Sequence, residues 1–206
     1  MSDGSITLAM TGASGALYGL RLLEHLLLAG ETVHFLLSTP ARLVIKMELG
    51  VSLPSRVQDL KAHLIDQYAA SVQQLHVYGI DQWTAPIASG SAISRAMVIC
   101  PCTSGTLASI AHGLSRNLIE RAADVSLKER KQLILVHRET PLSTIHLQNM
   151  LTLSQAGALI LPANPGFYNQ PQTIQDIIDT VVARTLDHLN IEHQLLPRWG
   201  ERPDAE

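Results

Sequence analysis

Short apolar runs alternate along this chain with longer stretches in which apolar residues recur every three or four positions. The short runs predict five strands, at residues 6–10 (ITLAM), 32–38 (TVHFLLS), 96–101 (AMVICP), 132–138 (QLILVHR) and 158–163 (ALILPA). Each run is nearly continuous, which is typical of strands buried on both faces, and a helical stretch follows each one. We therefore expect an α/β fold in which helices cover both faces of a parallel sheet, with no linker or repeat dividing residues 1–206.

The composition narrows the range of partners. The 206 residues include 15 Lys or Arg and 18 Asp or Glu, and this net charge of −3 comes without any basic tract of the kind that binds nucleic acid. No apolar run approaches the roughly 20 residues of a membrane span, and the first residues lack a signal-peptide pattern. Cys100 and Cys102 flank a single proline, which is poor geometry for a disulfide. We expect a cytoplasmic protein with reduced, packed thiols and neither nucleic-acid nor membrane partners.

The loop TGASG, residues 11–15, lies between the first predicted strand and a helical stretch. Ligands of parallel sheets bind beyond the carboxyl ends of strands, so this loop is a candidate site. Gly12 and Gly15 permit close backbone approach, and the free N–H groups of a helix beginning near Ser14 would suit a phosphate. The spacing Gly12, Gly15, Gly19 matches neither the dinucleotide motif nor a P-loop. The competing interpretation is that Ser14 caps the helix and the glycines serve packing.

A second loop of the same kind, TSGT at 103–106, follows the third predicted strand. Together the two loops would place many hydroxyl and backbone N–H donors on one edge of the sheet, as a phosphorylated heteroaromatic ligand requires. The segment SGSAIS at 89–94 is either a third polar loop at this site or a solvated turn.

Cationic residues form a further group. Arg121 and Lys128 are seven residues apart, so they share one helical face with Asp124. They form either a surface ion-pair stripe with Glu120 and Glu129 or part of a phosphate pocket with the other candidate cations, Arg138, Arg184 and Arg198. The chain has no two adjacent aspartates, and its nine histidines lack ligand spacing, so we expect no metal site.

Several long segments of the chain resemble the UbiX-like flavin prenyltransferases, over about residues 6–201. They are GASG with the following Tyr18 and Gly19, CPCTSGTL, NLIERAADVSLKERKQLILVHRETPL, HLQNML, GALILPANPGFYNQPQTIQDIIDTVVARTLD and LLPRWGE. The resemblance implies one flavin-binding domain over 1–206 with a single-domain Rossmann-like (flavodoxin-like) fold. It also implies a metal-independent enzyme that joins a dimethylallyl group from dimethylallyl phosphate to N5 and C6 of reduced FMN.

The resemblance implies partners as well. The product, prenylated FMN, would be the cofactor of UbiD-like decarboxylases, in ubiquinone biosynthesis or in related aromatic acid decarboxylation. The family's oligomers imply a homododecamer in which the C-terminal tail, residues 190–206, contributes to subunit contacts.

Site residues follow from the resemblance position by position. Those matched to FMN contacts are Gly12, Ala13, Ser14, Ser38, Thr103, Ser104, Gly105, Thr106 and Arg138. Those matched to dimethylallyl phosphate are Arg121, Lys128, Tyr168, Arg184 and Trp199, the last reached from a neighbouring subunit. Those matched to catalysis are Ser14, Glu48, Glu139 and Lys128, and the division of proton transfer between the two glutamates stays open. The chain departs from the family pattern in MELG around Glu48 and in STPA at 38–41.

Two alternatives remain at this point. A flavin-dependent cysteine decarboxylase of the same fold would carry a PASANT-like segment and a PxMN motif, whereas the matching regions here are SGSAIS and PANPGFY. A non-enzymatic FMN-binding subunit would need the flavin loops but no second cationic pocket. The presence of Lys128, Tyr168 and Arg184 favours the enzyme.

Overall fold

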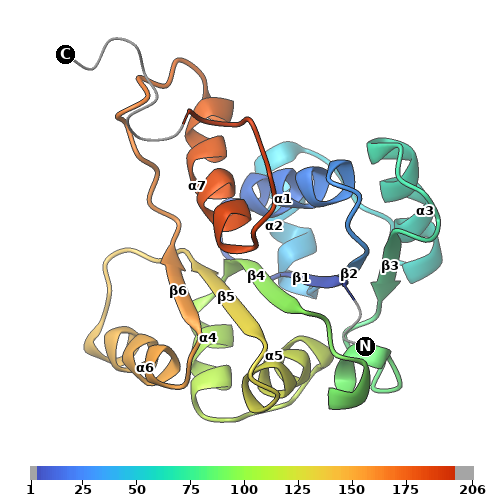
Figure 1. Ribbon diagram of the computed structural model, residues 1–206, viewed down its shortest axis with the longest axis vertical. Coiled ribbons are helices and arrows are strands. Elements are labelled where there is room, and N and C mark those ends of the chain that lie inside the picture. The colour runs from blue at the N-terminus through green and yellow to red at the C-terminus, as the bar shows by residue number, and fades with distance from the viewer. Residues whose placement is uncertain (1–3, 198–206) are drawn as a thin grey trace.

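Six parallel strands form one sheet in the order β3-β2-β1-β4-β5-β6 (Figure 1). The computed structural model describes residues 4–197. The strands are β1 (Ile6–Met10), β2 (Val33–Leu37), β3 (Leu75–Tyr78), β4 (Ala96–Cys102), β5 (Gln132–His137) and β6 (Leu159–Pro162). The chain winds outward in one direction from β1 to β3 and in the other from β4 to β6, which is the doubly wound Rossmann order. The expected fold class is confirmed.

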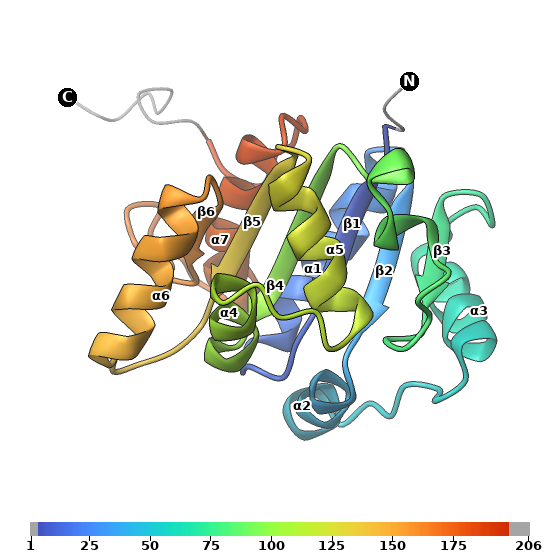
Figure 2. The ribbon, with the colours of Figure 1, turned by 90° about the horizontal axis from the view of Figure 1, so that it is seen from below.

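Helices cover both faces of this sheet, as the continuous apolar runs predict. They are α1 (Ala16–Leu28), α2 (Thr39–Leu49), α3 (Val57–Tyr68), α4 (Ser104–Ala111), α5 (Leu118–Lys128), α6 (Thr144–Gln155) and α7 (Ile174–His188), with two short 3-10 turns, η1 (Pro86–Ala88) and η2 (Gly90–Ala92). In Figure 2, α4, α5 and α6 lie in front of the sheet, and α1 and α7 lie behind it.

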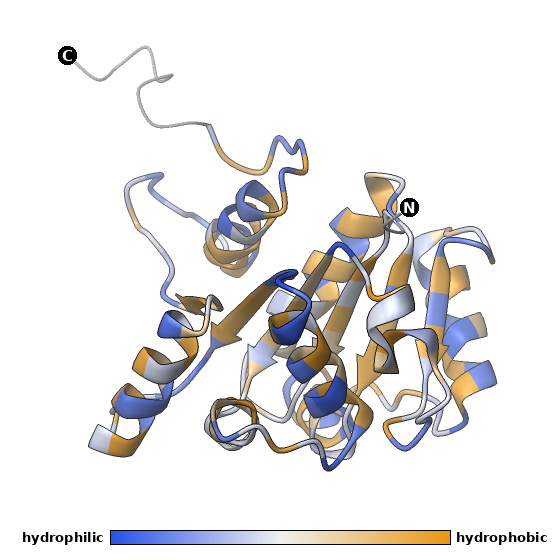
Figure 3. Cartoon of the chain, turned by 60° about the horizontal axis from the view of Figure 1, so that its bottom comes forward, coloured by the Kyte–Doolittle hydropathy of each residue, from blue (hydrophilic) through white to orange (hydrophobic). Residues whose placement is uncertain are grey.

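Each strand residue faces one of two cores. Val98 and Cys100 of β4 pack with α1 and α7, whereas Met97 and Ile99 pack with α4 and α5 on the opposite face. The central strands β1, β2, β4 and β5 are accordingly apolar at most of their positions, and many polar residues lie on the outer sides of the helices (Figure 3). Burial on both faces is therefore the reason that the strands appear in the sequence as runs and not as alternations.

The structure adds one strand that the apolar pattern does not predict. β3 has only four residues, LHVY, and lies at the edge of the sheet beside β2. Its residues alternate between buried and half-buried positions, so it lacks the continuous apolar run that marks the central strands. His76 and Tyr78 occupy its half-buried positions, whereas β6, the edge strand on the other side of the sheet, keeps an apolar run and was predicted.

Two smaller expectations can also be assessed. Cys100 and Cys102 are free and buried, and burial raises the pKa of both thiols, to about 12 for Cys102. Both therefore serve packing, as expected. The segment at 89–94 precedes β4, so it lies at the amino edge of the sheet, away from the loops after β1 and β4. In the part of the chain that is described, no helix is both long and apolar enough to cross a bilayer.

Candidate functional site

The two loops predicted to share a site lie side by side at the point where the strand order reverses. β1 and β4 are neighbours in the sheet, and Thr11 connects the loops that follow them. Its Oγ1 donates to the Pro101 carbonyl oxygen over 2.8 Å and accepts from the Thr103 N–H over 2.9 Å. The switch point of a doubly wound sheet is the usual place for a ligand. The prediction that both loops meet at one edge is therefore confirmed.

A cavity of about 240 Å³ lies between these loops. Three of its lining residues are helix N-caps: Ser38 of α2, Thr103 of α4 and Asn117 of α5. Its other lining residues are Thr11, Gly12, Pro40, Ile80, Thr106 and Ile119. Each cap uses one neutral side-chain oxygen, and the three hydrogen bonds to it, from the N–H groups of Ala41, Thr106 and Glu120, are 3.0–3.1 Å long.

Three helix N-termini at one small cavity make it a site for an anion. Each helix N-terminus carries about half a positive charge, which the neutral caps do not cancel; of these three helices α5 alone has an acidic residue in its first turn, Glu120, and that carboxylate is paired with Arg116. Backbone N–H groups at such ends are suited to a phosphate. The described cavity is therefore a better phosphate site than the loop at 11–15 alone.

Asn117 is a lining residue that the sequence reasoning missed. It lies directly before the strongly amphipathic α5, and Glu120 occupies the third helical position. An Asn followed three residues later by Glu is a capping signature, so the signal was present. What the sequence does not contain is the convergence of this cap with Ser38 and Thr103, because 79 and 14 residues separate it from them.

The N-terminus of α1 is closed in a different way. Gly15 is its N-cap in the left-handed region, at φ 99°, and Ser14 makes no capping hydrogen bond. The carboxylate of Glu48, from α2, accepts from the N–H of Gly15 over 2.9 Å and from the N–H of Ala16 over 2.8 Å. The interpretation that Ser14 caps this helix is therefore wrong. A phosphate at this helix end would compete with Glu48 for the N–H groups of Gly15 and Ala16.

Gly12 serves a close contact between the first loop and α2. A Cβ at this position would lie 2.4 Å from Cβ of Pro40, which is too close for any real side chain. The contact therefore holds the loop against the start of α2 and helps to bring Glu48, further along that helix, to Gly15. Pro40 belongs to the divergent segment STPA, so this departure from the family pattern lies in the wall of the cavity.

Electrostatics keep Glu48 ionised. Burial raises its pKa, but hydrogen bonds from the Ser14 side chain and from the N–H groups of Gly15 and Ala16, with the charge of Arg138, outweigh it and leave the pKa below its usual range. Arg138 also donates from Nε to the Ser14 carbonyl oxygen over 3.2 Å. The structure thus brings three predicted site residues, Ser14, Glu48 and Arg138, together at the rim of the candidate site.

A second carboxylate lies on the same edge of the sheet. Glu139, just after β5, accepts from Ser104 Oγ over 3.0 Å and from the Thr140 N–H over 3.2 Å. These hydrogen bonds, with that of Ser104 the strongest influence, lower its pKa. Two ionised carboxylates with Arg138 beside them can accept and return protons near a bound ligand. Ser104, Arg138 and Glu139, which the sequence analysis names as candidate site residues, therefore lie together on this edge.

The cations on α5 are paired within the chain. Arg121 donates to the carbonyl of Ala88 and pairs with Asp124 over 3.0 Å, and Lys128 pairs with Glu129. Glu120 is buried and pairs with Arg116 instead. Exposed pairs of this kind contribute little stability, so their cations can exchange a carboxylate for a phosphate at small cost.

One chain does not bring the predicted cations together. Lys128 lies eleven residues beyond Asn117 on α5, which is roughly 16 Å along a helix. Arg184 lies on α7, on the opposite face of the sheet from α5 (Figure 1). Among residues 4–197, the cavity that Arg184 lines includes neither Arg121 nor Lys128. α5 connects β4 to β5 on one face of the sheet, whereas α7 follows the last strand and packs against α1 on the other face, so these cations do not converge within residues 4–197.

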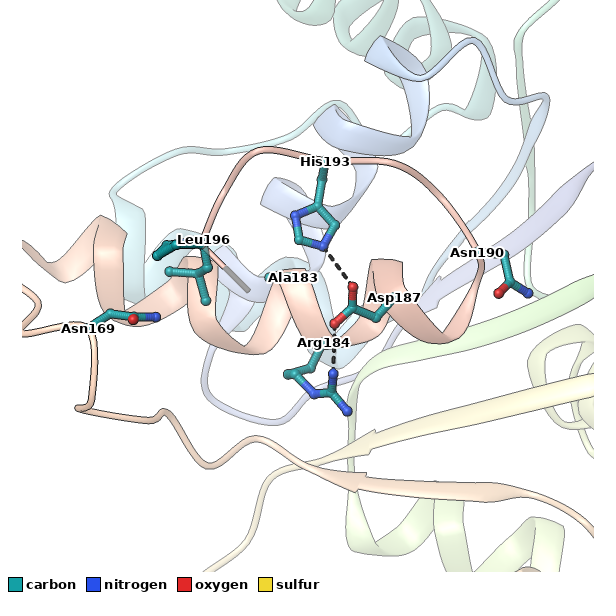
Figure 4. Close-up of a pocket in the computed structure, with 8 residues that line it drawn as sticks. Asn169, Ala183, Arg184, Asp187, Asn190, His193 and Leu196 are labelled. Atoms are coloured by element: carbon teal, nitrogen blue, oxygen red, sulfur yellow. Dashed lines mark hydrogen bonds and ion pairs between the residues drawn. The ribbon is translucent and has the colours of Figure 1, made fainter. Parts of the chain in front are cut away.

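Arg184 lines a cavity of its own, of about 560 Å³ (Figure 4). It pairs with Asp187 over 2.7 Å, and His193 Nε2 approaches the other oxygen of that carboxylate at 3.1 Å. Asn169 lines the same cavity, so the loop that carries Tyr168, which is 78% exposed, lies next to it. Trp199 lies outside the described residues. Among residues 4–197, no three His, Cys, Asp or Glu side chains are grouped to hold a metal ion.

Comparison with known families gives one match over most of the chain. The family model described as Flavoprotein matches residues 1–186. A relative named Flavin prenyltransferase UbiX, from Pseudomonas aeruginosa, is 57% identical over 197 residues, which are 96% of this chain and 94% of the relative.

Two solved structures are similar over nearly the full length. The crystal structure of AnUbiX in complex with FMN and dimethylallyl pyrophosphate has a TM-score of 0.84 and 40% identity, covering 95% of this chain and 96% of that one. The structure of a dodecameric FMN-dependent UbiX-like decarboxylase from Escherichia coli has a TM-score of 0.82 and 40% identity, covering 95% and 98%.

Proposed function

We propose that this chain joins a dimethylallyl group to N5 and C6 of reduced FMN. The chain belongs to the Flavoprotein family and, within it, to the UbiX-like flavin prenyltransferases. The product would be prenylated FMN. The observation that carries the proposal is the cavity bounded by three neutral helix N-caps beside two ionised carboxylates. This arrangement supplies a phosphate site and proton acceptors at one sheet edge.

The described residues fit FMN when its phosphate lies in the cavity and its ring lies at the rim. The cavity between Ser38, Thr103 and Asn117 would hold the phosphate. Residues on the remaining rim would surround the ring: Gly12, Ala13, Ser14, Ser104, Gly105, Thr106 and Arg138 stay the proposed flavin contacts. Reduced FMN would supply the nucleophilic nitrogen and carbon atoms.

The chain's own residues would then handle charge and protons. Breaking the allylic C–O bond leaves negative charge on the departing phosphate, and Arg121, Lys128 and Arg184 would stabilise it. Tyr168 would donate a hydrogen bond to the same phosphate. Glu48 or Glu139 would accept the proton lost from the flavin carbon, because each lies on the rim as a carboxylate.

The placement of the cations supports an oligomer. Because Lys128 and Arg184 lie on opposite faces of one chain, we infer that neighbouring copies complete the donor site, as a homododecamer would allow. A dodecameric relative supports this number.

Subunit contacts also have candidate surfaces. Three exposed apolar residues on α6 suit such a contact: Ile145, Leu147 and Leu151. The tail at 190–206, with Trp199, is a further proposed contact. We also propose the cytoplasm as the location and a UbiD-like decarboxylase as the recipient of the product.

Mass spectrometry of the flavin tests the function directly. Purified protein is incubated without oxygen with reduced FMN and either dimethylallyl monophosphate or the diphosphate. We expect a flavin heavier by one C5H8 unit. An unchanged flavin mass with both donors would overturn the proposal. The two donors are compared because the similar crystal structure contains the diphosphate, whereas the resemblance implies the monophosphate.

Mixed oligomers test the shared site. Arg121→Ala and Arg184→Ala subunits are each expected to be nearly inactive alone. If neighbouring copies complete the site, mixing and reassembling the two should restore part of the activity, because some sites then receive both arginines. No recovery in verified mixed oligomers would contradict the shared site.

A further inference from the structure

A buried histidine lies directly behind Glu139. His137 ends β5 and is only 3% exposed. Its Nε2 lies 3.0 Å from Ser104 Oγ, and the same hydroxyl donates to Glu139 Oε2 over 3.0 Å. The three side chains therefore form a line from the interior of the sheet to the rim of the candidate site.

The number of hydrogens on each group determines which side chain donates in each of these two hydrogen bonds. A serine hydroxyl has one hydrogen, and an ionised carboxylate can only accept. If Ser104 donates to Glu139, it must accept from His137, so the imidazole carries its hydrogen on Nε2. His137 is thus the interior donor that determines which way the hydroxyl points.

The charges that face His137 are those of Arg138, Glu139 and His146. Burial lowers the pKa of His137, and His146 and Arg138 act in the same direction, while Glu139 opposes them. His146 packs edge-on at 6.4 Å between ring centroids, and its Nδ1 accepts from the Ser143 N–H over 3.3 Å. His137 is therefore neutral at neutral pH and remains a single-hydrogen donor.

The line matters because Glu139 is otherwise exposed. Its Oε1 accepts from the Thr140 N–H and its Oε2 from Ser104. Two donors on two oxygens fix the carboxylate in one orientation, which water alone would not do. A carboxylate accepts a hydrogen bond more strongly than a protonated carboxyl group does, so the hydrogen bond from Ser104 favours the ionised form of Glu139.

We propose that His137 is a positioning residue that acts through Ser104 to orient Glu139 and keep it ionised for proton transfer. This rests on the proposed function only in the role given to Glu139. The neutral imidazole holds the serine hydroxyl toward the carboxylate, and the carboxylate then returns any proton that it accepts to the departing phosphate or to water.

Nuclear magnetic resonance of the full chain without flavin tests the proposal independently of activity. The carboxyl carbon of Glu139 and the ring nitrogens of His137 are titrated in the wild type, His137→Leu and His137→Gln. We expect hydrogen on Nε2 in the wild type, a higher Glu139 pKa in His137→Leu and a return toward the wild-type pKa in His137→Gln, whose amide can donate. Hydrogen on Nδ1, or the same Glu139 pKa in folded His137→Leu, would overturn the proposal.

Two further variants keep the test decisive. Ser104→Ala removes the hydroxyl between His137 and Glu139 at the half-buried first residue of α4, and it should also raise the Glu139 pKa. This variant replaces His137→Leu if that variant does not fold. His34→Leu replaces another buried histidine, on β2, and should leave that pKa unchanged. An unchanged Glu139 pKa in Ser104→Ala would also contradict the proposal.

The pH profile of prenyl transfer gives the functional readout. In His137→Leu the rate at pH 5, relative to that at pH 8, should fall by roughly three- to tenfold beyond the wild-type ratio, because Glu139 then protonates at higher pH. His137→Gln should recover most of the wild-type ratio. If the wild type makes no prenylated flavin, the proposed function fails while the resonance experiment still decides the role of His137.

Discussion

Four helices begin near the candidate site, and their N-termini are closed in two chemically different ways. α2, α4 and α5 are capped by the neutral side chains of Ser38, Thr103 and Asn117, which line one cavity. α1 instead receives the carboxylate of Glu48. Neutral caps leave the positive helix ends available to an anion, whereas a carboxylate cancels its helix end. The same structural feature, a helix start at a sheet edge, therefore supplies a phosphate site in one region and a held proton acceptor in the other.

The largest expected effect comes from neutralising Glu48. In Glu48→Gln the N-terminus of α1 keeps an acceptor but loses the charge, and the chain loses one of its two rim carboxylates. We expect the rate of prenyl transfer in a single turnover to fall by roughly 100-fold or more, with FMN affinity changed much less. Glu24→Gln, which changes a half-buried glutamate of α1 that pairs with Arg21 outside the proposed site, is the matched control. A rate within twofold of the wild type would remove Glu48 from the proposed chemistry.

The next largest effect is expected on stability, when the contact between Gly12 and Pro40 is disturbed. Gly12→Ala places a Cβ against Pro40, so we expect a loss of about 1–3 kcal/mol of unfolding free energy, measured in urea. Pro40→Gly removes the opposing Cβ and should recover part of that loss in the double variant. Equal losses with and without Pro40→Gly would show that the contact is not the cause.

Replacing a neutral cap by a carboxylate should give the N-terminus of α5 the kind of charged cap that α1 has. Asn117→Asp keeps a good helix cap but puts negative charge beside the cavity. FMN affinity, measured by fluorescence titration, should weaken by at least about tenfold. Riboflavin, which has no phosphate, should bind with nearly unchanged affinity. Equal weakening for both ligands would place the phosphate elsewhere.

The smallest effect is the acid dependence of stability. The pKa of Glu48 is lowered in the folded chain, so its contribution is present above the unfolded pKa and is lost as the pH falls through the folded pKa. A charge at an α-helix N-terminus is worth about 0.3–1 kcal/mol. Glu48→Gln should therefore show a shallower fall in Tm between pH 7 and pH 3 than the wild type. If Tm falls equally with pH in the wild type and in Glu48→Gln, the charge of Glu48 does not stabilise the N-terminus of α1.

Much of the fold follows from local patterns in the sequence. The five continuous apolar runs correspond to β1, β2, β4, β5 and β6; burial on both faces explains the runs of β1, β2, β4 and β5, and the half-buried edge strand β6 keeps an apolar run as well. β3 was missed because its four residues, LHVY, alternate apolar and polar positions and form no apolar run. The site was partly predictable as well. Loop residues such as Ser14, Ser104 and Arg138 lie where the carboxyl ends of strands place them.

The sequence by itself determined the five strands with apolar runs, the sheet edge that carries the loops and, through family motifs, most of the candidate residues, though not β3 or Asn117. Only the tertiary structure decided which groups meet. Glu48 reaches Gly15 across 33 residues, and this depends on how α2 packs against the first loop at Gly12 and Pro40. The packing of α7 against α1, on the face of the sheet opposite α5, likewise separated Lys128 from Arg184. Secondary structure follows from short-range periodicity, whereas capping partners and charge neighbours depend on packing between segments distant in the chain.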